Sequence, residues 1–162
     1  MSRRPRRRRP ILVDSSPLLL LLVGTYERGL VERFKRTKAY SHDDFDLLVQ
    51  FLAGRRVIAT PGVLAEVSNM AMQLRREDFS RLVERNIDGL RRTREIHIAK
   101  DIIIESPEFK KIGATDTSLL LAARENDWEV LTSDHPLCSR CRREGVEATH
   151  MMELQTRAEQ FM

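Results

Sequence analysis

Short apolar segments alternate with longer amphipathic ones along most of this chain, and this alternation constrains the fold more than any other feature. The short segments suit buried strands, while the longer ones carry apolar residues at the three- and four-residue spacing of helices. The expected strands are 11–14, 56–59, 95–99, 129–132 and 146–149. Strands that alternate with helices form parallel sheets that are covered on both faces. The sequence therefore predicts an α/β fold, a three-layer α/β/α sandwich around a central parallel sheet of four to five strands.

Capping residues mark where several of the helices should begin. The expected starts are Ser16 with Pro17, Ser41 with Asp44, and Thr60 with Pro61. The expected helices are 18–23, 41–53, 60–74, 78–90, 115–126 and 135–144, with a broken helix over 101–112. Segment 24–40 is charged, contains two glycines and matches no single element.

The basic charge of the chain lies in its first ten residues. The net charge is +4, but six arginines and no acids stand in 1–10, which leaves 22 basic against 24 acidic residues in the remainder. We expect 1–10 to be a disordered arginine-rich leader, because it has almost no apolar content to bury. It is either an arm for nucleic-acid phosphates or a solvated leader. We expect one domain over 11–155, followed by a short C-terminal helix to 162.

Neither a membrane span nor a structural metal site is expected. The apolar stretch after the leader is interrupted by Asp14, two serines and Pro17, so it is too short and too polar for a signal peptide or a span. We therefore expect a cytoplasmic protein. Cys138 and Cys141 form a C-x-x-C motif without a second cysteine pair. Two reduced thiols partly covered by a helix are favoured over half a zinc site or a redox pair.

Four acids stand where a plain surface acid would not. Asp14 ends the first expected strand, and Asp134 follows the strand 129–132. Asp116 interrupts the apolar stripe of its helix, so its carboxylate should point inward, where burial without a partner is costly. Glu66 borders the apolar stripe of the helix that follows the second strand. Acids that converge in this way need a counter-charge, which a hard divalent cation supplies.

Each acid also has a purely structural interpretation, and these alternatives stay open. Asp134 would cap the helix that begins at 135, and Asp14 would bond the turn that follows it. Asp116 would favour the dipole at a helix start, with Thr115 as the cap. Glu66 would be a solvated helix residue. The four structural roles are independent of one another, whereas a single metal site explains all four positions at once.

The ordered set of segments around these acids resembles the PIN-domain nucleases over most of 11–154. The matching segments are ILVDSS, ATPGVLAEVSN, KKIGATDTSLLLAA and VLTSDHPL. The resemblance implies endonucleolytic RNA cleavage with Mg²⁺ or Mn²⁺. It makes Asp14, Glu66, Asp116 and Asp134 both the catalytic and the metal-binding set. The polar residues that it implies as their support are Ser15, Asn69, Thr132 and Ser133. Many small members are dimeric toxins inhibited by a small antitoxin, so the resemblance also implies a homodimer and an antitoxin partner.

The predicted activity is hydrolysis of single-stranded or looped RNA. Backbone amides at helix starts and the basic pair Lys110 and Lys111 would contact the substrate, and His135 is either exposed or near a phosphate. One alternative is a catalytically idle PIN-like module that binds RNA or protein. Another is a Rossmann-like phosphatase or phosphotransfer domain. A phosphatase would want a second Asp where Ser16 stands, and a receiver domain would want acids where the leader has arginines. No glycine-rich phosphate loop is present either.

Overall fold

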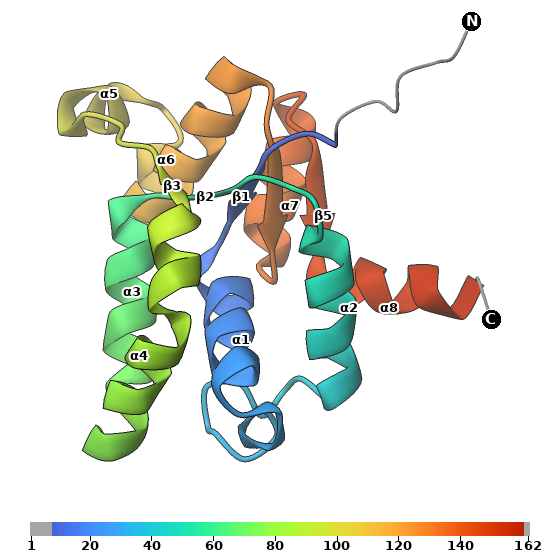
Figure 1. The fold of residues 1–162 in the computed structure, drawn as a ribbon. Coiled ribbons are helices and arrows are strands. Elements are labelled where there is room, and N and C mark those ends of the chain that lie inside the picture. The colour runs from blue at the N-terminus through green and yellow to red at the C-terminus, as the bar shows by residue number, and fades with distance from the viewer. Residues whose placement is uncertain (1–7, 161–162) are drawn as a thin grey trace, which may run out of the picture.

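The fold is α/β, with a central sheet of five parallel strands (Figure 1). The computed structural model describes residues 8–160. The elements in chain order are β1 (Ile11–Val13), α1 (Ser15–Tyr26), the 3-10 helix η1 (Arg28–Leu30), α2 (His42–Leu52), β2 (Val57–Ala59), α3 (Pro61–Ala71), α4 (Arg76–Arg92), β3 (Arg94–Glu95), α5 (Lys100–Glu105), α6 (Phe109–Asn126), β4 (Glu129–Thr132), α7 (His135–Arg143), β5 (Ala148–His150) and α8 (Met151–Gln160). The predicted fold class is confirmed, with five strands in the sheet.

The strand order is β3-β2-β1-β4-β5, so β1 lies at the centre of the sheet. Leu12 pairs with Ile58 of β2 on one side and with Val130 of β4 on the other. All three side chains are fully buried, which explains why these strands are apolar throughout and do not alternate with polar residues. The order reverses between β1 and β4, and parallel sheets bind ligands at the carboxyl ends of the strands where such a reversal occurs.

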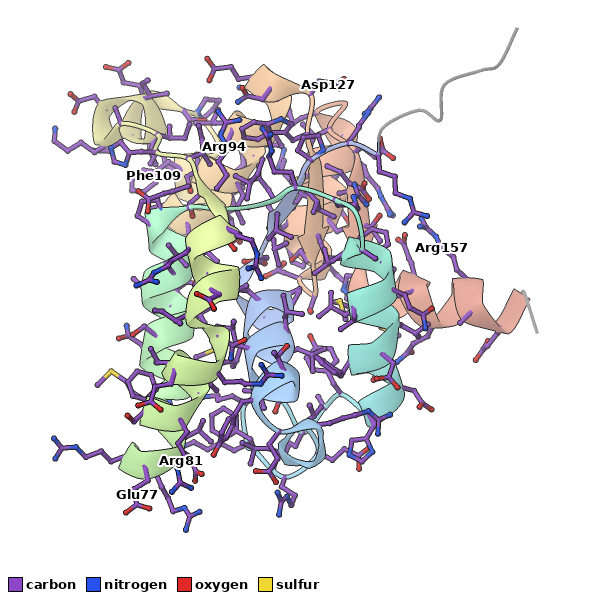
Figure 2. The ribbon with its side chains drawn as sticks, in the orientation of Figure 1. Glu77, Arg81, Arg94, Phe109, Asp127 and Arg157 are labelled. Atoms are coloured by element: carbon purple, nitrogen blue, oxygen red, sulfur yellow. The ribbon has the colours of Figure 1, made fainter. Side chains whose placement is uncertain are left out.

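The helices cover the sheet in two groups. Figure 1 shows α1 between α2 on one side and α3 and α4 on the other, and α1 packs against all three. On the other face, α6 packs against α7, and both contact β4. The run of five leucines makes α1 apolar nearly all round. Such a helix is stable only when other elements enclose it, as they do here. Charged side chains such as Glu77, Arg81 and Arg157 point away from this packed interior (Figure 2).

One close approach inside the helical layer depends on a glycine. A Cβ at Gly24 of α1 would lie 2.2 Å from Cδ2 of Phe45 on α2. The glycine therefore lets the aromatic ring lie directly on the α1 backbone. Segment 24–40, which the sequence left unassigned, contains the end of α1, the 3-10 helix η1 and the turns that lead to α2. It is ordered through turns that bury Val31, Phe34 and Thr37.

Several expected element starts were wrong. The first helix begins at Ser15, and its N-cap is Asp14 in place of Ser16. The expected broken helix over 101–112 is the short α5 followed by the start of α6, which continues through a kink at Gly113 (φ 79°). The starts at Ser41 and Thr60 were correct, and the Ser41–Asp44 capping box is complete. The other helix and strand boundaries mostly differ from the expected ones by a few residues. The last hydrogen bonds of each element decide where it ends. The last strand is β5 at 148–150, and the helix that follows it starts at Met151.

Most of the predicted disordered leader, 1–7, lies outside the described residues, but its last residues are held against the sheet. The Arg9 guanidinium lies 2.7 Å from Glu147, and the Arg9 carbonyl accepts a hydrogen bond from Arg55. The Pro10 carbonyl accepts one from the backbone N–H of Glu129. Residues 9 and 10 are therefore held beside the sheet by the Arg55 side chain and by the backbone of β4.

The two cysteines are free thiols in α7, and both are buried. Burial raises the pKa of Cys141 to about 12. Thiols with a raised pKa are poor nucleophiles and poor metal ligands, because both roles need the thiolate. Separately, no helix within residues 8–160 is long and apolar enough to cross a membrane.

Candidate metal and catalytic site

The candidate site lies where β1 and β4 end side by side. The two strands pair in parallel, with Val13 opposite Leu131. Asp14 follows β1 directly, and Asp134 lies two residues beyond the end of β4. The sequence suggested that these two acids could meet if their strands were neighbours, and the strands are neighbours. The site therefore occupies the place where the strand order reverses.

Asp14 is the innermost acid, with only 8% of its surface exposed. Its Oδ2 accepts a hydrogen bond from the Thr132 hydroxyl at 2.7 Å, and its Oδ1 accepts one from the backbone N–H of Ser15 at 2.7 Å. Burial raises the pKa of Asp14, and the two hydrogen bonds partly offset that rise. This carboxylate caps α1 and is also fixed in orientation toward β4.

Glu66 reaches the site from α3 and links three helices. Its Oε2 accepts a hydrogen bond from the Ser15 hydroxyl of α1, and its Oε1 accepts one from the Thr115 hydroxyl of α6 at 2.8 Å. The two helices α3 and α6 approach closely because Gly62 has no side chain. A Cβ there would lie 3.1 Å from the Thr115 hydroxyl oxygen. Although Glu66 is solvent-exposed, its carboxylate is held toward the ends of the strands.

Asp116 is the acid with the most perturbed titration. It lies on α6 three residues after the kink at Gly113, one turn before the fully buried Leu119 and Leu120. Burial raises its pKa to about 7, and the negative charges of Asp14, Asp134 and Glu66 add to the rise. No hydrogen bond to its carboxylate counteracts these effects among the described residues. The charge of each of the other three acids therefore acts on Asp116.

Asp134 completes the set from the start of α7. Its Oδ1 accepts a hydrogen bond from the backbone N–H of Leu137 at 2.9 Å, so it caps that helix. Its own N–H donates to the Thr132 hydroxyl, which in turn donates to Asp14. Thr132 therefore ties the two strand-end acids together. The carboxylate of Asp134 is otherwise open to solvent.

The predicted supporting residues divide into two groups. Ser15 and Thr132 contact the acids, as described above. The Asn69 side chain is exposed and makes no hydrogen bond within the described part of the chain, while the Ser133 hydroxyl bonds Tyr40 and not an acid. In the structural alternative for Asp116, Thr115 was a helix cap; it lies inside α6, and its hydroxyl donates a hydrogen bond to Glu66. Its position beside Asp116 was the sequence signal that could have pointed to this role.

The donor chemistry of the four acids fits a hard divalent cation such as Mg²⁺ or Mn²⁺, which prefers carboxylate oxygens. Asp116 in particular presents a partly buried charge that no described cation neutralises. No set of three or more His, Cys, Asp or Glu residues within 8–160 surrounds a single ion position in the arrangement present here. Carboxylates repel one another when no cation lies between them, so binding of a divalent cation would draw these side chains closer together.

Comparisons with known proteins identify no family. No protein-family model matches the chain, and no curated protein matches it. One solved structure with a similar arrangement is described as a domain of a functionally unknown protein from Methanocaldococcus jannaschii DSM 2661. It shares 16% sequence identity at a TM-score of 0.45, over 88% of this chain and 90% of that one. A likeness at this level carries no argument about function.

Proposed function

We propose that this protein is a metal-dependent endoribonuclease of the PIN type, which hydrolyses RNA phosphodiesters with Mg²⁺ or Mn²⁺. The observation that carries the proposal is Asp116, a carboxyl with a pKa of about 7 that is partly buried beside three other acids. A carboxyl whose pKa is shifted so far by burial and by like charges, near the carboxyl ends of parallel strands, is typical of a functional site. The ordered segments that resemble PIN nucleases support the same assignment.

Asp14, Glu66, Asp116 and Asp134 would hold the cation. When bound, it would lower the pKa of a water molecule and stabilise the charge that develops on the phosphodiester. Ser15 hydrogen-bonds both Asp14 and Glu66, so it keeps these two carboxylates in fixed relative positions. Such residues behind the ligands fix ligand orientation and affect metal affinity.

Asp116 would lose its proton when the cation is loaded. Its pKa of about 7 leaves a substantial protonated fraction near neutrality in the absence of the cation. Because ligands must be deprotonated, metal affinity should rise with pH through this range. Lys110 and Lys111 are exposed in the first turn of α6. We propose that they contact the RNA backbone.

A second candidate function is an idle module that binds RNA or protein without cleaving it. One observation favours this alternative. Three of the four acids already have structural hydrogen bonds, and the described residues include no ready-made cluster of three metal ligands. A homodimer and an antitoxin partner are further proposals that follow from the family resemblance alone. A cytoplasmic location is a proposal that rests on the polar residues interrupting the apolar stretch after the leader.

The test is a paired measurement of Mn²⁺ binding and RNA cleavage. We expect Mn²⁺ binding, measured by electron paramagnetic resonance, and cleavage of a single-stranded RNA that EDTA abolishes. Asp116→Asn and Asp14→Asn should each reduce cleavage by more than about 100-fold, beyond the usual effect of a residue that only supports a ligand. The matched control is Asp88→Asn, because the Asp88 side chain is 76% exposed on α4.

The outcomes separate the two candidate functions. Mn²⁺ binding that the Asp116 and Asp14 variants remove, together with EDTA-sensitive cleavage, supports the nuclease. RNA binding with neither Mn²⁺ binding nor cleavage identifies the idle module. Full cleavage by both variants would mean that the four acids are not the active site.

A further inference from the structure

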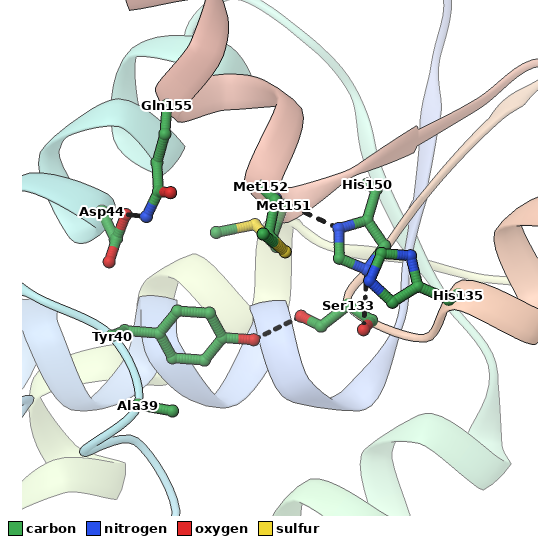
Figure 3. A pocket seen from close by; sticks show the side chains of 9 residues that line it. All are labelled: Ala39, Tyr40, Asp44, Ser133, His135, His150, Met151, Met152 and Gln155. Atoms are coloured by element: carbon green, nitrogen blue, oxygen red, sulfur yellow. Dashed lines mark hydrogen bonds between the residues drawn. The ribbon is translucent and has the colours of Figure 1, made fainter.

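A cavity of about 250 Å³ opens beside Asp134, at the ends of β4 and β5 (Figure 3). The side chains that line it include Tyr40, Asp44, Ser133, His135, His150 and Gln155. Ser133 and His135 are the immediate neighbours of Asp134 in the chain. Tyr40 hydrogen-bonds both Ser133 and Ser16, which lies two residues after Asp14. The cavity therefore lies next to the strand ends that carry the acids.

Two stacked imidazole rings form one side of this cavity. The ring centroids of His135 and His150 lie 3.9 Å apart with an interplanar angle of 9°. His150 is buried, and both its nitrogens are engaged. Its Nδ1 accepts a hydrogen bond from the backbone N–H of Met152, and its Nε2 donates to the Ser133 carbonyl. His150 is thus locked in place and holds the exposed His135 ring in a fixed plane.

Besides the rings and the apolar side chains of Ala39, Met151 and Met152, the cavity lining includes polar groups and one carboxylate. Asp44 is buried, with 6% of its surface exposed, and accepts hydrogen bonds from Gln155 and from Ser41. The Tyr40 and Ser133 hydroxyls add groups that both donate and accept. A flat aromatic platform beside hydrogen-bonding groups suits a planar heterocycle with polar edges. The Asp44 carboxylate disfavours a phosphate in the same cavity, because like charges repel.

We propose that this cavity binds an unpaired nucleobase of the substrate, with His135 as the stacking platform, next to the phosphodiester that the four acids address. This inference rests on the proposed function, since it assigns a base-binding subsite to the same RNA. Proteins commonly recognise single-stranded RNA by stacking splayed bases on aromatic side chains, histidine among them. The cavity would place one base beside the acid site, and the chain would continue toward Asp134.

The first test needs no catalysis. The histidine Hε1 protons are followed by NMR, in EDTA, while each of the four nucleoside 5′-monophosphates is added. Ribose 5-phosphate is the matched probe without a base. We expect an upfield ring-current shift at His135 with the nucleotides and none with ribose 5-phosphate. Absence of any shift at His135, or an equal shift with ribose 5-phosphate, would overturn the proposal.

The second test uses variants that separate stacking from charge. Dissociation constants for a single-stranded oligoribonucleotide are measured in EDTA by fluorescence anisotropy. His135→Ala should weaken binding about tenfold, the loss typical of one base stacked on an aromatic ring. His135→Phe should retain most of the affinity, because it keeps a flat ring. The control His42→Ala removes a histidine that does not line the cavity and should leave the affinity unchanged.

The outcomes also distinguish this proposal from the proposed function. If RNA is cleaved but His135→Ala changes neither the dissociation constant nor KM, the base pocket is wrong and the nuclease stands. If nucleotides shift His135 but no cleavage occurs with Mg²⁺ or Mn²⁺, the pocket stands and the nuclease is wrong. If His135→Phe loses as much affinity as His135→Ala, stacking is not the source of binding. Circular dichroism of each variant verifies that it is folded.

Discussion

Replacing Asp116 by Asn should stabilise this protein, and the gain should depend on pH in a defined direction. The pKa of Asp116 rises from 3.8 to about 7 on folding, mainly because the carboxyl is buried. Each unit of pKa corresponds to about 1.4 kcal/mol, so the ionised carboxylate costs at most about 4 kcal/mol in the folded state. Solvent screening at a carboxyl that is only partly buried reduces this cost to about 2 kcal/mol.

The sign follows from the two pKa values. Below pH 3.8 the carboxyl is protonated in both the folded and the unfolded chain, so it makes no difference to stability. As the pH rises from there to about 7, the unfolded chain loses the proton first, and the folded state becomes progressively less stable. Asn is neutral at every pH. Asp116→Asn should therefore equal the wild type near pH 4 and exceed it in stability at pH 8.

Thermal unfolding in EDTA, followed by circular dichroism from pH 4 to pH 8.5, measures this difference. At pH 8 the variant should melt about 4–8 °C above the wild type. Asp88→Asn, at a side chain that is 76% exposed, should show no such pH dependence. Mn²⁺ at about 100 times its dissociation constant should stabilise only the wild type, by about 2.7 kcal/mol. This stabilisation should remove the difference in melting temperature between the wild type and the variant at pH 8. The predicted cost of the ionised Asp116 carboxylate is wrong if the variant melts below the wild type at pH 8. It is also wrong if the difference between the two melting temperatures does not change with pH.

Three other substitutions and one chemical treatment test the packing of the fold. Thr132→Val keeps the side-chain shape but removes the hydroxyl that donates a hydrogen bond to Asp14. The free energy of unfolding, measured by urea denaturation, should fall by about 1–3 kcal/mol. An unchanged denaturation midpoint would contradict this. Gly24→Ala should destabilise by about 1–3 kcal/mol, because the new methyl group meets the Phe45 ring. Gly89→Ala has open space and should be neutral or stabilising in the same assay. The two buried thiols of α7 should react with a thiol reagent at pH 8 only when the chain is unfolded, and fast labelling of the native protein would show that α7 opens locally.

The features that sequence reasoning captured are those set by local periodicity. The apolar stripe of α6 predicted that Asp116 points inward, and the structure partly buries this residue one turn before fully buried leucines. The Ser41 capping box and the start of α3 at Thr60 with Pro61 were also read correctly, because capping depends on adjacent residues. Alternation of strands and helices was enough to predict a parallel sheet.

The features that it missed depend on contacts between residues far apart in the chain. Whether β1 pairs with β4 is a property of the whole sheet, and no local pattern encodes it. Tyr40 lies in the segment that could not be assigned, yet its hydroxyl bonds Ser16 and Ser133 beside the site. His135 at the start of α7 stacks on His150 at the end of β5, although the two residues are 15 positions apart in the sequence. Spacing along the sequence gives no indication of either contact.

The four acids do not support the proposed chemistry equally, because three of them make structural hydrogen bonds that account for their presence. Asp14 caps α1 and Asp134 caps α7, while Glu66 joins α3 to α1 and α6. A fold could keep these three for stability alone. Asp116 accepts no stabilising hydrogen bond from a described residue, and its ionised form is disfavoured by burial and by the other three acids. A carboxyl that costs stability and lies among three like charges is typical of a functional site, so the nuclease proposal depends chiefly on Asp116.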